Sequence, residues 1–176
     1  PLSRGRASLM TRFLIVFMLL LLSLFTIENM NIVQEKAIDP FTTALATTSV
    51  FIIEAFDDNV VSRGRVLRST ENGFAVEIQA GCNGVEAVII LVAALFAFPA
   101  PFRYKLVGLA VGIVAIQALN LVRIISLFYL GQWNMTAFEW FHLYLWQALI
   151  ILDALVVWLI WLRRIPRTES QPALTA

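Results

Sequence analysis

The chain has 176 residues, of which 60% are hydrophobic and 14% are charged, and its mean hydropathy is +0.81. A soluble domain has about 45 to 50% apolar and about 25% charged residues. A domain of this length also leaves roughly a third of its unfolded surface exposed, so an aqueous core cannot bury this much apolar surface. The composition therefore predicts an integral membrane protein whose apolar surface is covered by the lipid bilayer.

Charge and cysteine content exclude several other classes of protein. The formal net charge of +1 excludes a dedicated nucleic-acid-binding protein. Cys82 is the only cysteine, which excludes an intrachain disulfide scaffold and a zinc–cysteine cluster. We expect neither a metal ion nor a cofactor in this protein.

Five apolar runs follow one another along the chain, and they need not all cross a membrane. A helix needs about 20 residues to cross a hydrocarbon core of about 30 Å. The second run has only sixteen residues and contains several threonines, Ser49 and Glu54, so its length and polarity argue against a span. The runs are 13–27, 41–56, 85–98, 106–130 and 140–162.

The basic residues decide between the two topologies, because Lys and Arg near span ends collect on the cytoplasmic side. If 41–56 does not cross, eight basic residues lie inside and four lie outside; if it crosses, six lie on each side. Arg123 falls within a span in both cases. The bias favours four spans with both termini in the cytoplasm, near 8–28, 84–100, 104–129 and 140–162.

The remaining segments complete the predicted fold, an all-α integral membrane protein with a single domain over 1–168. The first span is expected to remain uncleaved, because no A-x-A site follows it. The run 41–56 is expected to form an interfacial or re-entrant helix. Alternating apolar residues on both sides of a turn signal predict a short extracytoplasmic β-hairpin over 63–80. The tail 169–176 is expected to be disordered.

Three reactive side chains share one predicted depth, because each is about one span away from a cytoplasmic basic residue. Cys82 precedes Arg103 by 21 residues, and Arg123 follows Arg103 by 20 residues. His142 precedes Arg163 by 21 residues. At about 1.5 Å per residue, each of the three lies about 30 Å from the cytoplasmic basic layer, near the outer leaflet.

These residue types at a common depth are typical of cysteine acyl transfer. A helix N-terminus lowers the pKa of a thiol, and we expect this effect at Cys82. His142 is suited to take the thiol proton and later give it to a leaving amine. Arg123 stays charged and is suited to hold a tetrahedral oxyanion, with the N–H groups of Asn83 and Gly84 as possible further donors.

Each residue taken alone also has a structural interpretation. Cys82 is then an inert small apolar residue, and His142 is an interfacial side chain satisfied by water. Arg123 is then a side chain that reaches the outer headgroups, although a charge within a span costs at least about 2.5 kcal/mol. The shared depth of the three residues favours the catalytic interpretation.

Two further polar residues are candidates for supporting roles. Asn120 lies on the same helix face as Arg123, where it either orients the guanidinium, contacts the substrate, or forms a hydrogen bond between helices. Glu86 either pairs with Arg123, orients His142, or is a first-turn acid stabilised by the helix dipole, and the last alternative is favoured.

The sequence Gly81-Cys82-Asn83-Gly84-Val85-Glu86 after a hairpin, with Asn120-Leu121-Val122-Arg123 and then His142, resembles the exosortase/archaeosortase family of membrane transpeptidases. The resemblance covers residues 40–165 and implies that Cys82 is the nucleophile, with Arg123 and His142 completing the catalytic set. Family members typically have more spans ahead of this core. The chain therefore resembles a short form, and its cysteine motif is similar to that of the exosortase H subgroup.

The resemblance also implies a substrate class and a location. The expected partners are secreted proteins whose C-terminal sorting signal consists of a short motif, a transmembrane helix and a basic cluster. The expected location is the bacterial inner membrane, with the active site on the periplasmic side. The alternative is a non-catalytic membrane scaffold or assembly factor, in which the intramembrane charges only hold helices together.

Overall fold

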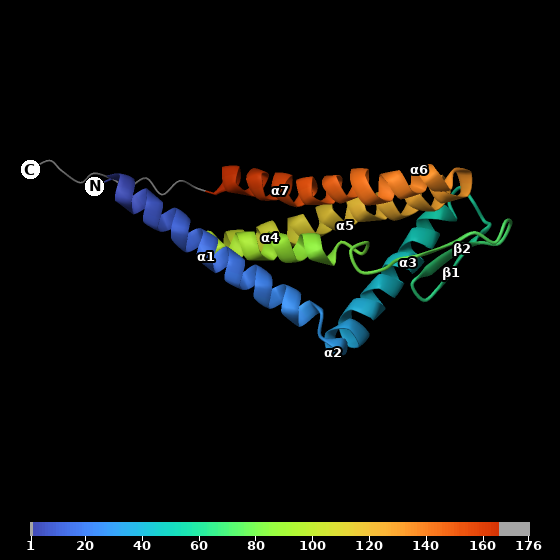
Figure 1. The fold of residues 1–176 in the computed structure, drawn as a ribbon, viewed down its shortest axis with the longest axis horizontal. Coiled ribbons are helices and arrows are strands. Elements are labelled where there is room, and N and C mark those ends of the chain that lie inside the picture. Colours follow the sequence, from blue (N-terminus) through green and yellow to red (C-terminus); the bar gives the residue numbers. More distant parts are fainter. Residues whose placement is uncertain (1, 166–176) are drawn as a thin grey trace, which may run out of the picture.

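The computed structural model describes residues 2–165, and the chain is mainly helical over this range. Both ends of the described chain lie at one end of an elongated helical bundle, and a small sheet lies at the other end (Figure 1). The tail 169–176 lies outside the described residues. The helices of the bundle are α1 (Leu2–Glu28), α4 (Val85–Ala97), α5 (Phe102–Trp133) and α7 (Trp146–Arg164).

Three helical stretches in the described part of the chain are long and apolar enough to cross a membrane. They are Leu9–Glu28, Phe102–Trp133 and Met135–Arg164. The last stretch is continuous, because α6 (Met135–Trp140) and a π-helical turn (Phe141–Leu145) lead directly into α7. The all-α membrane fold predicted from the composition is therefore confirmed.

The fourth predicted span, 84–100, is shorter in the structure than expected. Helix α4 has 13 residues, which rise about 20 Å and do not reach across a hydrocarbon core of about 30 Å. Gly84 precedes it with a φ of +76°, a left-handed conformation that ends helical geometry on that side. Pro99 and Pro101 follow it, and the chain is extended at Phe98.

The segment predicted as an interfacial helix over 41–56 belongs to a longer helical stretch that begins nearer α1. Here α2 (Asn31–Val33) and a π-helical turn (Gln34–Ile38) lead into α3 (Asp39–Ile53). Helix α3 runs obliquely to the bundle and contacts the sheet and α5 (Figure 1). Its hydroxyl side chains donate to carbonyls one turn earlier, as Ser49 does to Leu45, so they remain satisfied away from water.

The sheet has three antiparallel strands in the order β1-β2-β3, whereas the sequence predicted only a hairpin. The predicted hairpin corresponds to β2 (Val66–Ser69) and β3 (Ala75–Glu77). Strand β1 (Val60–Arg63) pairs with the other edge of β2 through a tight turn at Gly64, where φ is +57°. Arg65 ties the sheet to α3 with an ion pair of 2.9 Å to Asp39.

The protein has two apolar cores, one on each side of the start of α4 at Val85. One core joins α4, α5 and α7, and glycines let these helices approach closely: a Cβ at Gly112 would collide with Leu91, and one at Gly108 with Trp161. The other core joins α3, the sheet and the far half of α5. Its buried members are Leu45, Ala46, Val50, Ile53, Val60, Leu67, Ile78, Ile124 and Phe128.

Candidate active site

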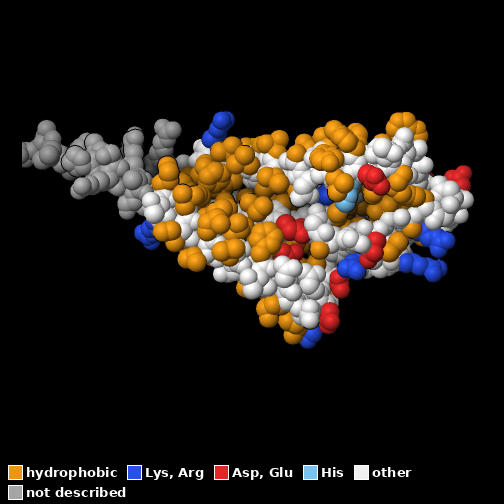
Figure 2. Space-filling view, viewed as in Figure 1, with side chains coloured by type: hydrophobic (Ala, Val, Ile, Leu, Met, Phe, Trp, Pro, Cys, Tyr) orange, Lys and Arg blue, Asp and Glu red, His pale blue; other side chains and the backbone are white. Residues whose placement is uncertain are grey.

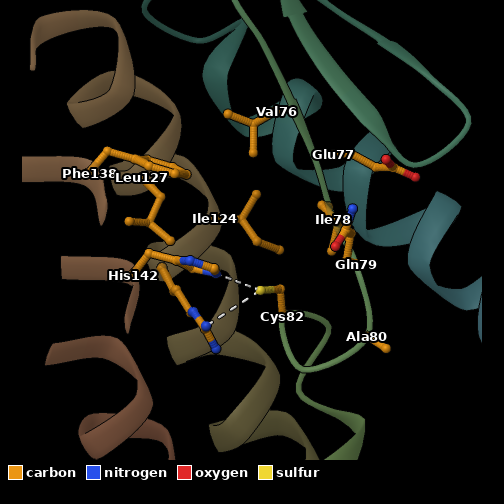
Figure 3. Close-up of a pocket in the computed structure, with 11 residues that line it drawn as sticks. Val76, Glu77, Ile78, Gln79, Ala80, Cys82, Ile124, Leu127, Phe138 and His142 are labelled. Atoms are coloured by element: carbon orange, nitrogen blue, oxygen red, sulfur yellow. Dashed lines mark hydrogen bonds between the residues drawn. The ribbon is translucent and has the colours of Figure 1, made fainter. Parts of the chain in front are cut away.

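Cys82, His142 and Arg123, which the sequence predicted to share one depth, converge between the two cores. Cys82 Sγ lies 2.9 Å from His142 Nε2 (Figure 3). Arg123 Nη2 donates to the same sulfur at 3.5 Å. The three residues come from the loop before α4, from the π-helical turn before α7 and from the middle of α5. The thiol therefore contacts both an imidazole nitrogen and a fixed positive charge.

The loop that carries Cys82 is held at several points. Its own N–H donates to the carbonyl of Gln79 at 3.0 Å, and the Gly81 N–H donates to Glu86 Oε1 at 2.5 Å. Gly81 has a φ of +83°, a turn that favours glycine. These contacts connect the loop to the first turn of α4, so the position of the sulfur is fixed relative to that helix.

The π-helical turn gives His142 its orientation. A π-helical turn closes its hydrogen bonds over one residue more than an α-helix, and such turns are frequent at functional sites. Here the Trp146 N–H donates to the Phe141 carbonyl. The imidazole stacks on the ring of Phe138 with centroids 5.6 Å apart and an interplanar angle of 17°. Phe138 therefore holds the imidazole in place beside the thiol.

Arg123 is almost completely buried, with 1% of its surface exposed. Besides its contact with the sulfur, its Nη1 donates to the Gly81 carbonyl at 3.2 Å. The guanidinium thus bridges α5 and the cysteine loop. A buried charge needs partners of this kind, since leaving one unpaired costs several kcal/mol.

The electrostatic surroundings of Cys82 differ from the expectation drawn from the sequence. Burial raises the pKa of the thiol above its ordinary value, the Arg123 guanidinium opposes this effect, and the Glu86 carboxylate adds to it. Helix α4 begins only at Val85, three residues later, and its first turn already carries Glu86. The prediction that the helix N-terminus lowers this pKa was therefore wrong, because the effect of burial is larger.

The four predicted supporting residues hold the framework of the site. Glu86 contacts the Gly81 N–H, as expected for a first-turn acid, and forms no ion pair with Arg123 among the described residues. Asn120 is fully buried and donates to Gln117 Oε1 at 3.4 Å. Gly84 lies against this pair, because a Cβ there would lie 3.0 Å from Gln117 Nε2.

Asn83, the fourth supporting residue, connects the cysteine loop to two helices. Its Oδ1 accepts from the Val85 N–H at 3.1 Å, and its Nδ2 donates to Thr42 Oγ1 on α3 at 3.2 Å. Asn83 and Thr42 are 1% and 2% exposed, so this bond is shielded from water. Thr42 and Phe138 therefore contribute to the site, although no sequence motif distinguishes them.

A pocket of about 130 Å³ opens beside the sulfur. One of its walls is the end of β3 with the residues that follow, and the other wall comes from α5 and α6 (Figure 3). The histidine is visible where the apolar side of the bundle meets the charged end of the molecule (Figure 2). The pocket is lined by Val76, Glu77, Ile78, Gln79, Ala80, Cys82, Arg123, Ile124, Leu127, Phe138 and His142.

Comparison with known proteins identifies one family. A family model described as transmembrane exosortase matches residues 2–157, a range that contains Cys82, Arg123 and His142. No curated protein and no solved structure matches the chain. The match extends over most of the 176 residues, far more than the cysteine motif alone. The chain therefore belongs to the transmembrane exosortase family.

Proposed function

We propose that this protein is a cysteine-dependent membrane transpeptidase or protease that cleaves C-terminal sorting signals of secreted proteins. The observation that carries the proposal is the pair of contacts to one sulfur, 2.9 Å to His142 Nε2 and 3.5 Å to Arg123 Nη2. A thiol, a base within direct reach and a buried cation are the groups that acyl transfer from a peptide requires.

The proposed reaction proceeds through a thioester. His142 Nε2 accepts the proton of Cys82, and the thiolate attacks the scissile carbonyl carbon. Arg123 stabilises the thiolate first and the oxyanion next. The imidazolium then gives its proton to the leaving amine as the C–N bond breaks. An acceptor amine or water attacks the thioester and loses a proton to His142. The imidazolium returns this proton to the sulfur as the C–S bond breaks, which regenerates the thiol.

The proposed substrate approaches from within the bilayer. Its transmembrane helix would stand beside the bundle, and its short motif would reach the level of Cys82. The proposed location is the inner membrane of a bacterium with the site on the periplasmic side. This sidedness agrees with the basic residues Arg103, Arg163 and Arg164, which belong to the start of α5 and the end of α7.

Co-expression with a secreted reporter tests the proposal. The reporter carries a C-terminal sorting signal, with motif, apolar helix and basic cluster, from a protein of the same bacterium. Wild type should release the reporter from its anchor, whereas Cys82→Ala, His142→Ala and Arg123→Ala should leave it uncut. Arg63→Gln, which removes an exposed arginine at the end of β1, is the matched control. Normal cleavage by Cys82→Ala would refute the proposal.

The alternative function, a non-catalytic scaffold, predicts a different behaviour of the thiol. Cys82 is the only cysteine, so a thiol reagent reports on this site alone. The enzyme should be labelled from the outside in native membranes, and the reporter should protect it. A scaffold thiol would resist labelling until the protein is denatured.

A further inference from the structure

Strand β3 leads into the cysteine loop and has one unpaired edge. It is the last strand of the sheet, and within residues 2–165 it pairs only with β2. The Ile78 N–H donates to the Arg65 carbonyl at 2.9 Å, so residue 78 and every second residue before it direct their backbone groups toward β2. The backbone N–H and C=O groups of Ala75 and Glu77 therefore point to the open edge.

The pocket beside Cys82 lies along this edge. Five consecutive residues, 76–80, line it. Of these, Val76 and Glu77 belong to β3 and the other three follow its end. Because neighbouring side chains of a strand point to opposite faces, a pocket lined by both Val76 and Glu77 follows the edge of the strand and not one face of the sheet. Across the pocket, Ile124, Leu127 and Phe138 provide an apolar wall, and Cys82 lies at its end (Figure 3).

We propose that the substrate segment carrying the scissile bond binds as an extended strand added to the open edge of β3. This inference rests on the proposed function, since an occupant of the pocket must present a carbonyl carbon to the thiol. An extended peptide matches the edge, because its own N–H and C=O groups alternate with the same period. Its backbone pairs with Ala75 and Glu77, and every second side chain enters the apolar pocket.

Strand addition also fixes which bond is cut. Pairing with β3 sets the register of the substrate, and the chain of the enzyme continues from Glu77 to Cys82 within five residues. A shift of one residue would turn every substrate side chain to the other face. The sheet therefore selects the scissile bond, and the three reactive residues act on the carbonyl presented to them.

Proline substitution on the enzyme tests the inference. Ala75→Pro removes an outward N–H and leaves the bonds between β2 and β3 intact. Ser62→Pro, on the opposite edge strand β1, is the matched control. The Thr70 N–H donates to the Asn59 carbonyl, so Asn59 and every second residue after it direct their backbone groups toward β2. The backbone N–H of Ser62 therefore points outward, as that of Ala75 does. Cleavage of the reporter should fall about tenfold in Ala75→Pro, the loss expected for one backbone hydrogen bond. It should be unchanged in Ser62→Pro.

Two readouts separate a local effect from misfolding and from failure of the proposed function. The rate of alkylation of Cys82 by iodoacetamide should be the same in both proline variants as in wild type. Equal cleavage by Ala75→Pro and wild type would overturn strand addition. If wild type does not cleave the reporter at all, the proposed function fails, and the inference fails with it.

A second test leaves the enzyme unchanged. Proline is placed in turn at successive reporter residues on the N-terminal side of the scissile bond, and cleavage by wild type is measured. Strand addition predicts that cleavage alternates between low and high with a period of two, because only every second substrate N–H pairs with β3. A loss that does not alternate with position would overturn the inference.

Discussion

Replacement of Arg123 by glutamine should make Cys82 a much weaker nucleophile, even in the absence of substrate. The guanidinium donates to the sulfur at 3.5 Å. At an effective dielectric constant of about 20, a charge pair at this distance interacts with about 5 kcal/mol. Since water and side chains relax around the vacated site, we expect only part of this energy to be lost. A loss of about 1.4 kcal/mol already slows a thiolate reaction tenfold.

The assay is the rate of alkylation of Cys82 by iodoacetamide as a function of pH, followed by intact mass. Only the thiolate reacts, and burial raises the pKa of Cys82 above its ordinary value. The wild-type rate should therefore rise with pH and reach half its limit above the ordinary thiol pKa. The cation lowers this pKa, so Arg123→Gln should move the midpoint higher and slow alkylation at neutral pH at least tenfold.

Two controls make the result specific. Arg123→Lys keeps the charge and should fall between wild type and Arg123→Gln. Arg63→Gln removes an exposed charge at the end of β1 and should leave the profile unchanged. If Arg123→Gln gives the same pH profile as wild type, the guanidinium does not act on the sulfur, and the reasoning is refuted.

Three further predictions concern the framework of the site. Gly84→Ala places a Cβ at a φ of +76° and 3.0 Å from Gln117 Nε2, so it should lower the unfolding free energy in detergent. Gly73→Ala is the control, because Gly73 has a φ of +75° and open space around it, and its loss of unfolding free energy should be smaller. Equal losses would show that the contact with α5 is unimportant. Thr42→Val leaves the buried Asn83 amide without its acceptor and should cost about 1 to 3 kcal/mol of stability in the same measurement, while an unchanged stability would contradict this role. Asp57 accepts hydrogen bonds from Asn59 and Tyr129, and these lower the pKa of its carboxyl. The stability that Asp57 contributes is present above its ordinary pKa and is lost as pH falls through the lowered pKa. Tyr129→Phe should therefore reduce thermal stability at pH 7, and the reduction should become smaller as the pH falls.

The common depth of Cys82, Arg123 and His142 could be predicted because helices have a fixed rise. Counting residues from Arg103 and Arg163 placed Cys82, Arg123 and His142 at one level, and the structure brings them into contact. Counting residues gives the depth of a side chain along the helix axis, but it does not give the direction in which the side chain points. The π-helical turn that orients His142 has no signature in the sequence, and neither does the stacking of its ring.

Other features depend on contacts between segments that are far apart in the chain. The raised pKa of Cys82 results from burial among residues of several elements, whereas the motif around it suggested only a helix N-terminus. Strand β1 was missed because its residues lack clear alternation and it is defined by pairing with β2. The short α4 was overestimated because apolar residues continue past its end at Ala97 as extended chain.

The separation of the reactive residues along the chain has a consequence for biosynthesis. His142 follows Cys82 by 60 residues and lies at the start of the last described helical stretch into α7. Because the chain is made from its N-terminus, Cys82 is synthesised 60 residues before His142. A partly synthesised chain thus has no proton acceptor beside its sulfur. Under the proposed mechanism, a given chain therefore becomes competent for acyl transfer only after its last described helical stretch has been inserted.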